Sequence, residues 1–403
     1  MRTQQSLWTA HQGWTGRGGE PADLLLAFGG TQAITNKKLW NEMSNRHPGA
    51  IVLGCSTGGE IHGADVLDES LSVTAMGFDR TKLRSAEAAV NDGGDSFAAG
   101  QSIGKSLSGP DLKTVFVLSD GTRVNGSELI RGIRACVGNQ VVITGGLAGD
   151  GPRFGTTYVG LNSEPKPGRV AAVGFYGDAV TVGHGSAGGW DVFGPERRIT
   201  RSKGNVLYEL DGNPALDLYK RYLGEDAKGL PGSGLLFPLK VFPPSRPTEA
   251  LTRTVVGVDD EQHTMTFASD MPEGYSAQLM RGNFDRLVEG AAEAAHQATL
   301  PVSGDQVAVL ISCIGRKLLL GQRICEEVEA VQDVFGKATA RSAKSRLICS
   351  PMRSSSRRAA APYRSSSRCA AASWNSPSPT PVSASRRNIS RRCSSPSARS
   401  MPA

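Results

Sequence analysis

The sequence contains no long apolar run. A helix that crosses a bilayer needs about 20 consecutive apolar residues, and no stretch approaches that length. The first residues also lack the basic segment followed by an apolar one that marks a secretory signal. These absences predict a cytoplasmic chain that neither spans a membrane nor is exported.

Cysteine is scarce, with seven residues in 403. The cysteines before residue 340 lie far apart in the sequence, at Cys55, Cys136, Cys313 and Cys325. Such spacing matches neither a disulfide framework nor the paired ligands of a zinc site. We therefore expect a reduced protein without a metal site.

Acidic residues are absent from residue 340 onward, whereas twelve Arg and Lys344 lie there. Without these 13 residues, the 45 basic residues of the chain fall to 32, against 38 acidic ones. The body of the protein is thus mildly acidic, and its sequence does not predict specific binding of nucleic acid. The basic excess belongs to the last segment alone.

Two origins are open for residues 340–403. One is a disordered basic tail, which the Ser, Arg, Ala and Pro composition favours. The other is a reading-frame error, because codons for residues 341–352 read one base earlier permit Phe-Gly-Glu-Ile. That sequence resembles Gly59-Glu60-Ile61, so we favour a frameshift product.

A strand–helix–strand unit recurs along the chain. It begins at Leu24-Leu-Leu-Ala-Phe-Gly-Gly30, again at Val115-Phe-Val-Leu-Ser-Asp-Gly121, and a third time at Val307-Ala-Val-Leu-Ile-Ser-Cys-Ile-Gly315. The first two units close with a strand that ends in glycines, and the third lacks this strand. Short apolar runs before helical patterns are typical of strands buried under helices. We therefore predict an α/β fold of internally duplicated strand–helix–strand units, in mixed sheets covered by helices.

Other segments are predicted from their patterning. We expect antiparallel strands at residues 71–78, 168–182 and 252–268, and helices at residues 206–223, 281–300 and 316–334. Residues 99–106, Ala-Gly-Gln-Ser-Ile-Gly-Lys-Ser, approach a phosphate-binding loop but lack its first glycine and preceding strand. We interpret them as an amphipathic helix.

Glycine-rich turns follow several buried strands. Free backbone N–H groups and small side chains at such strand ends suit a polar or zwitterionic ligand. The acids there could bind an ammonium group and an arginine could bind a carboxylate, although tight turns with capping acids have the same appearance. The ligand-binding residues predicted at these turns are Gly54, Cys55, Ser56, Thr57, Gly58, Glu60, Asp120, Gly121, Gly145, Gly146, Asp150 and Arg316.

Catalysis has little support in the sequence. Gly54-Cys-Ser-Thr-Gly58 matches the pattern of a nucleophile elbow. That elbow needs a helix directly after it, and here another strand pattern follows. We predict no catalytic residue, and keep a hydrolase or transferase that uses Cys55 or Ser56 as an alternative.

His184 lies among glycines, in Gly183-His-Gly-Ser-Ala-Gly-Gly-Trp190. Glycines allow the backbone to approach a ligand closely, and a neutral imidazole can bind haem iron. A lone histidine is more often simply hydrogen-bonded. His184 is the candidate axial ligand if the protein carries haem; the cofactor is otherwise unknown.

Several of these motifs resemble the FIST family, whose N-terminal and C-terminal domains occur in bacterial signalling proteins. They are Gly54-Cys-Ser-Thr-Gly-Gly-Glu-Ile61, Gly145-Gly-Leu-Ala-Gly-Asp150, the His184 segment up to Pro195, residues 206–219, and Ile311-Ser-Cys-Ile-Gly-Arg-Lys317. The resemblance implies an N-terminal segment at 1–21, a FIST N-terminal domain at 22–225 and an incomplete FIST C-terminal domain at 226–339. The family's usual Tyr-Gly-Glu-Ile-like final strand is missing.

The resemblance also implies a function. Family members are sensors proposed to bind small molecules such as amino acids, and some are haem proteins that sense nitric oxide. The first hypothesis is therefore a non-catalytic sensor that signals to a separate histidine kinase or cyclic-dinucleotide enzyme. A haem-based nitric oxide sensor is the second hypothesis, and the hydrolase or transferase is the third.

Overall fold

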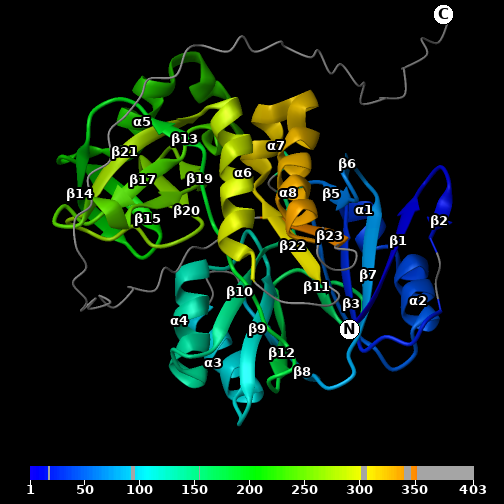
Figure 1. The fold of residues 1–403 in the computed structure, drawn as a ribbon. Coiled ribbons are helices and arrows are strands. Elements are labelled where there is room, and N and C mark those ends of the chain that lie inside the picture. Colours follow the sequence, from blue (N-terminus) through cyan, green and yellow to red (C-terminus); the bar gives the residue numbers. More distant parts are fainter. Residues whose placement is uncertain (17–18, 92–95, 154, 301–305, 340–345, 352–403) are drawn as a thin grey trace, which may run out of the picture. The chain divides into compact units, whose positions relative to one another are not determined.

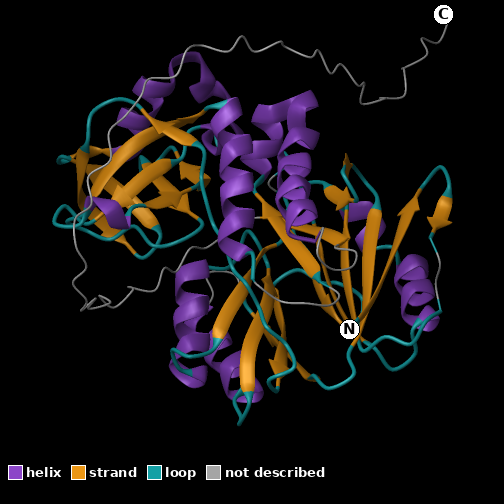
Figure 2. Ribbon diagram, in the orientation of Figure 1, coloured by secondary structure: helices purple, strands orange, loops and turns teal. Residues whose placement is uncertain are grey.

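The computed structural model describes residues 1–16, 19–91, 96–153, 155–300, 306–339 and 346–351; for 337–339 and 346–351 it gives the backbone alone. All elements named below belong to one unit, Met1–Ser355. They form four sheets with helices packed against them (Figures 1 and 2). The mixed α/β class predicted from the sequence is confirmed.

The first sheet contains the first strand–helix–strand unit. Strands β3 and β4 pair in parallel, starting with Leu24 opposite Ile51. Helices α1 (Thr31–Ile34) and α2 (Lys37–Arg46) connect them, and the side chain of Asn36 caps α2. Across the sheet the strands are β11 (Val159–Leu161), β4 (Ile51–Ser56), β3 (Leu24–Gly29), β7 (Leu71–Gly77), β1 (Arg2–Thr9) and β2 (Gly13–Thr15).

The second sheet contains the second unit in the same arrangement. Strands β9 and β10 pair in parallel, starting with Thr114 opposite Val142. Helix α4 (Gly126–Val137) connects them and is capped by the side chain of Asn125. As in the first sheet, an antiparallel strand lies on the other side of the unit's first strand. The strands are β10 (Val142–Leu147), β9 (Leu112–Ser119), β12 (Arg169–Tyr176) and β8 (Lys82–Ala89).

These two sheets pack face to face, with helices on their outer faces. Alternate residues of β3 divide between two cores: Leu24, Leu26 and Phe28 lie between the sheets, whereas Leu25 and Ala27 lie under α1 and α2. The residues of β9 alternate in the same way: Phe116 and Leu118 lie in the core between the sheets, whereas Val115 and Val117 lie under α3 (Ser96–Leu107) and α4. A strand buried on both faces needs apolar residues at every position, which explains the unbroken apolar runs.

Helix α3 accounts for the sequence that approaches a phosphate-binding loop. A Cβ added at Gly100 would lie 2.3 Å from the carbonyl oxygen of Leu129 in α4, and one added at Gly132 would lie 2.1 Å from that of Phe97. Lys105 is exposed. The glycines therefore serve close helix packing, and the predicted amphipathic helix is confirmed.

The third sheet is formed by residues 190–282 and is wholly antiparallel in its pairings. Its core lies against α5 (Ala215–Leu223) and includes Leu216, Tyr219 and Phe267. The strands are β13 (Trp190–Val192), β14 (Arg197–Lys203), β15 (Val206–Leu210), β16 (Asn213–Pro214), β17 (Leu239–Phe242), β18 (Leu251–Arg253), β19 (Val255–Asp259), β20 (Thr264–Phe267) and β21 (Ser276–Gly282). Short 3-10 helices are η1 (Gly224–Gly229), η2 (Gly232–Leu236), η3 (Pro247–Glu249) and η4 (Gly321–Arg323).

The fourth sheet contains the third unit and corrects one expectation. Strand β22 (Val307–Ser312) does have a parallel partner, β23 (Arg346–Pro351), in the position predicted to be empty. Beyond β23 lie β5 (Glu60–His62) and β6 (Asp65–Leu67). The sheet thus joins the third unit to the loop that follows the first. The remaining residues of the predicted tail, 340–345 and 352–403, lie outside the described residues.

Helices α6 (Phe284–Ala298), α7 (Ile314–Leu320) and α8 (Ile324–Thr339) pack together beside this sheet (Figure 1). The helix predicted at 316–334 is broken because Gly321 has a φ of 51°. The helix predicted at 206–223 is wrong in its first half, where β15 forms. Asp211 and Gly212 both have positive φ and turn the chain before α5.

Candidate functional site

The loop after β4 surrounds a fully buried carboxyl group. Glu60 is 0% exposed. One of its oxygens accepts a hydrogen bond from the Thr57 hydroxyl, and the other accepts from the Ser70 backbone N–H and hydroxyl, at 2.9 and 2.8 Å. The carboxyl group therefore ties the loop to the start of β7.

Burial raises the pKa of Glu60 to about 7, because the charged carboxylate loses its hydration. The hydrogen bonds from Thr57 and Ser70 and the charge of Lys317 act in the opposite direction, but they do not outweigh burial. Glu60 therefore changes its protonation near neutral pH.

Helix α7 contacts this loop directly. The Lys317 ammonium donates a hydrogen bond to the Gly58 carbonyl oxygen at 2.7 Å and forms an ion pair with Asp68. A Cβ added at Gly58 would lie 2.7 Å from Cδ1 of Ile314. The third unit thus packs on the loop that follows the first.

Asp150 is held at the neighbouring strand end. It accepts hydrogen bonds from the Thr31 hydroxyl at 2.7 Å and from Nε of Arg153 at 2.8 Å. Burial alone raises its pKa, but the hydrogen bonds from Arg153 and Thr31, with the charge of Arg153, lower the pKa overall below its ordinary value. Asp150 is therefore a carboxylate that is already neutralised by Arg153.

The predicted glycines lie against the backbone of neighbouring strands and turns. A Cβ added at Gly54 would lie 2.7 Å from the Ala27 carbonyl oxygen, one at Gly145 1.8 Å from that of Val117, and one at Gly121 2.0 Å from that of Ala148. Gly146 pairs with Leu118 in the β9–β10 ladder. These glycines are explained by close packing of the chain on itself.

Cys55 and Ser56 belong to β4. Cys55 lies in the core between the first two sheets. The Ser56 hydroxyl accepts a hydrogen bond from the Tyr158 backbone N–H at 2.9 Å. The chain continues from Ser56 into the loop and β5, without the helix that a nucleophile elbow requires.

Asp120 caps a turn at the end of β9. One oxygen accepts from the backbone N–H groups of Thr122 and Arg123 at 2.8 and 2.9 Å, and the other accepts from Gly168 N–H at 2.8 Å. The side chain is 0% exposed. Its hydrogen bonds give Asp120 a structural role, in place of the expected contact with an ammonium group.

Arg316 faces away from the strand ends. Its Nε lies 2.9 Å from Oε1 of Glu327, and its other nitrogens donate to the carbonyl oxygens of Gly188 and Leu287. It is 7% exposed. The structure therefore brings residues 54–60, Asp150 and Lys317 together, whereas Arg316 does not join them.

The glycines around His184 pack on α6. A Cβ added at Gly183 would lie 1.8 Å from the Ala298 carbonyl oxygen, and one added at Gly185 would lie 1.7 Å from that of Ala294. His184 itself is exposed. A haem held by this histidine needs space and apolar cover beside it, and the helix backbone fills the space next to both glycines. The glycines are therefore explained by packing on α6, and haem binding at His184 stays a prediction.

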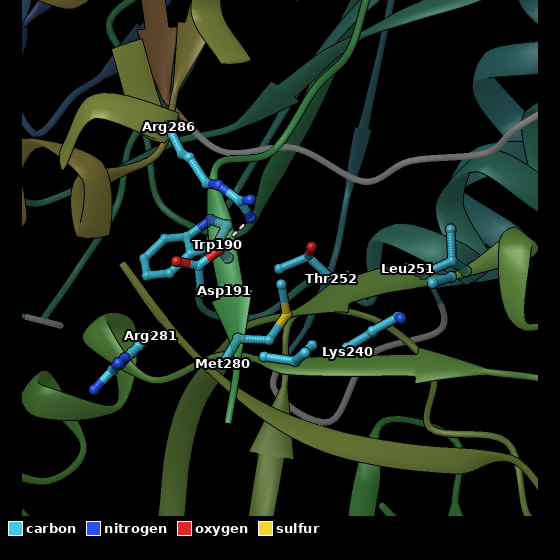
Figure 3. Close-up of a pocket in the computed structure, with 10 residues that line it drawn as sticks. Trp190, Asp191, Lys240, Leu251, Thr252, Met280, Arg281 and Arg286 are labelled. Carbon is cyan, nitrogen blue, oxygen red and sulfur yellow. Dashed lines mark hydrogen bonds and ion pairs between the residues drawn. The ribbon is translucent and has the colours of Figure 1, made fainter. Parts of the chain in front are cut away.

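A pocket that the sequence did not indicate lies on the third sheet, with a volume of about 510 Å³ (Figure 3). It is bordered by β13, β17, β18, β21 and the start of α6. The lining combines apolar and charged side chains from these elements. The lining residues are Trp190, Asp191, Val192, Lys240, Ala250, Leu251, Thr252, Met280, Arg281 and Arg286.

Charged groups lie at both sides of the pocket. Arg286 of α6 forms an ion pair with Asp191, whose second oxygen accepts from Asn283 Nδ2 at 3.1 Å. The Lys240 ammonium lies 5.0 Å from the ring centroid of Phe242. Figure 3 shows Arg281 pointing away from Met280 and Lys240. The pocket can therefore hold a ligand with both an apolar and a charged part.

Sequence patterns gave only partial signals for this pocket. Leu239-Lys-Val241 alternates as a strand with one buried face does, and Trp190 ends the glycine-rich segment. Their meeting depends on pairing of β13 with β21, which joins Trp190 to Gly282. No local pattern encodes a contact over that separation.

Among the described helices, none is both long and apolar enough to cross a membrane. Within the described residues, no group of three or more His, Cys, Asp or Glu could hold a metal ion.

Comparison with known proteins identifies the chain. The FIST N domain model matches residues 23–213, and the FIST C domain model matches residues 215–341. The division between the two matches lies before α5, earlier than the expected division at residues 225 and 226. No curated protein matches the sequence. Because the two matches cover most of its length, the chain belongs to the FIST family of sensory domains of signal transduction.

Proposed function

We propose that this chain is a non-catalytic sensor that binds a small ligand in the pocket on the third sheet and signals to a separate protein. The observation that carries the proposal is the origin of the pocket lining. Trp190, Asp191 and Val192 belong to the FIST N match, whereas the other lining residues belong to the FIST C match. The pocket is thus built where segments of both matches pair within one sheet, through β13 and β21.

The size and chemistry of the pocket support a small ligand. Its volume of about 510 Å³ is within the range of ligand sites, roughly 300–1,000 Å³. Trp190 and Val192 offer apolar surface, while Lys240, Asp191 and Arg286 offer charge. A few polar groups among apolar ones can orient a ligand and select it.

Helix α6 gives the pocket a physical connection to the rest of the protein. Arg286 lines the pocket, and the next residue, Leu287, accepts a hydrogen bond from Arg316. Arg316 is followed by Lys317, which holds Gly58 in the loop after β4. A ligand bound beside Arg286 therefore changes the balance between arrangements of α6 and α7, provided it binds them unequally.

The receiving protein belongs to the proposal as well. A histidine kinase or a cyclic-dinucleotide enzyme is the expected class of partner, and a ligand-dependent change in its activity is the expected output. Haem sensing is not part of the proposal, because His184 is exposed and lacks the apolar cover that a haem needs. Nor do we carry hydrolysis forward, because Cys55 and Ser56 are buried in β4.

A thermal-shift screen of small carboxylates, amines and amino acids tests the ligand site. Thr252→Trp places a large side chain at the pocket edge, and Ala89→Trp places the same side chain on the exposed edge strand β8 as a control. We expect at least one compound to raise the melting temperature of the wild type and of Ala89→Trp, but not of Thr252→Trp. A compound that stabilises all three equally binds elsewhere, and would contradict the assignment.

A further inference from the structure

Acids and bases in the pocket are unequally matched. Asp191 is the only acid among the ten lining residues, and Arg286 and Asn283 already engage both of its oxygens. Lys240, in contrast, forms no ion pair with any residue in the described part of the chain. Arg281 has no ion pair among the described residues either, but its guanidinium lies over the ring of Phe193 and points away from Met280 and Lys240 (Figure 3). The unmatched positive charge beside Thr252 is therefore that of Lys240.

Strand pairing directs Lys240 toward the pocket. Lys240 lies opposite Thr252 in β18 and opposite Gln278 in β21. Its neighbours Leu239 and Val241 point to the other face, where they belong to the core under α5. Because side chains alternate along a strand, Lys240 and Thr252 share the pocket face. An ammonium and a hydroxyl group are thus presented together.

An apolar surface lies next to these polar groups. Val192 pairs with Met280 across β13 and β21, and Trp190 lies two residues before Val192. Val192 is 45% exposed, which makes it one of the few large apolar side chains with that exposure in the described residues. A ligand with an apolar body would cover Val192 and Trp190 while its charged group reaches Lys240.

We infer that the pocket selects an organic carboxylate with an apolar body, and that Lys240 determines this specificity. The inference rests on the proposed function and names its ligand class. A zwitterion is disfavoured because its ammonium group has no acid to pair with while Arg286 holds Asp191. A phosphate dianion is disfavoured because the fork of Arg286, which suits phosphate best, is occupied.

Methyl NMR of the full chain with ¹³C-labelled methionine provides a test at the site itself, since Met280 lines the pocket. The Met280 methyl signal is identified as the one that is missing from the spectrum of Met280→Leu. Phenylacetate, phenylacetamide, phenethylamine and phenylalanine share one ring and differ in charge. We expect phenylacetate to shift the Met280 methyl signal with a dissociation constant about tenfold lower than that of phenylacetamide, since a charged hydrogen bond is lost in the amide.

Variants separate the role of Lys240 from a general effect of charge. Lys240→Met should remove the preference for phenylacetate over phenylacetamide, and Lys105→Met, at an exposed position of α3, should retain it. Phenylalanine or phenethylamine binding as tightly as phenylacetate would overturn the inference, and so would an unchanged preference in Lys240→Met. If phenylalanine or phenethylamine binds that tightly and Thr252→Trp abolishes this binding, the sensor pocket stands and only the ligand class is wrong. If none of the four probes shifts Met280 and no compound in the thermal-shift screen depends on Thr252, the inference and the proposed pocket both fail.

Discussion

Arg316 and Glu327 form an ion pair inside the protein, with Nε 2.9 Å from Oε1 and side-chain exposures of 8% and 9%. Ser312 donates a second hydrogen bond to the same oxygen at 3.0 Å. The other oxygen of Glu327 is buried and has no hydrogen-bond partner in the part of the chain described. The pair links β22, α7 and α8, and Arg316 extends it to α6 through Leu287.

Removing one member of this pair should destabilise the protein strongly. Arg316→Met leaves the Glu327 charge buried without its partner, and breaking such a pair costs about 3–5 kcal/mol of unfolding free energy. Arg323→Met is the control, since the pair of Arg323 with Asp285 is exposed and is worth about 0–1 kcal/mol. Urea denaturation measures both. An equal loss in the two variants would contradict a structural role for the buried pair.

Glu60 should make stability depend on pH. Its pKa is raised from 4.5 in the unfolded chain to about 7 in the folded one, so the folded state holds the proton more tightly. Glu60 therefore contributes on the order of 3 kcal/mol to the free energy of unfolding below pH 4.5. This contribution is lost as the pH rises to about 7. Glu60→Gln should flatten this decline in urea denaturation between pH 5 and pH 7.5. Glu87→Gln, at an exposed position of β8, should leave the decline unchanged; a decline that survives in Glu60→Gln belongs to another group.

The contact between α6 and the His184 segment should tolerate no added methyl group. In Gly290→Ala the new Cβ would lie 1.7 Å from the Gly188 carbonyl oxygen, so backbone must move. We expect a loss of at least about 1–3 kcal/mol. In Gly336→Ala, on an exposed turn of α8, no described atom lies within 4 Å and the change should stabilise by about 0.5–1 kcal/mol. If Gly290→Ala were as stable as Gly336→Ala in thermal unfolding, the described packing would be incorrect.

His184 should not bind haem. The protein purified from cells supplied with haem should show the same visible spectrum as His184→Ala, because His184 is exposed and lacks the apolar cover that a haem needs. A stoichiometric Soret band that disappears in His184→Ala and responds to nitric oxide would overturn this prediction. It would also restore the gas-sensor hypothesis.

The coding DNA should carry a small deletion or insertion near codon 340. The family match ends at residue 341, and no acid follows residue 339. Resequencing should then give a restored frame with Gly-Glu-Ile near the position of β23, and the restored chain should unfold at a higher temperature. An unchanged DNA sequence together with equal expression of the same C-terminus would support the disordered basic tail.

The sequence by itself determined the strand–helix–strand units, because each depends on local patterns. Unbroken apolar runs such as Leu24-Leu-Leu-Ala-Phe28 require burial on both faces, and the following helical pattern returns the chain for a parallel strand. The misassigned helix at Val206–Leu210 illustrates the limit of local patterns, since pairing with β14 and β20 decides that segment.

The tertiary structure alone decided what the glycines and charged residues do. Gly54, Gly145 and Gly185 have the same local appearance as ligand-contacting glycines, yet each lies against a backbone that is distant in sequence or across a sheet. Asp120 and Arg316 likewise find their partners within the chain. The pocket is made by pairing Trp190 with Gly282 and Lys240 with Thr252 and Gln278. Such contacts depend on which strands become neighbours, because burial and hydrogen bonding are satisfied across the whole fold and not within any one segment.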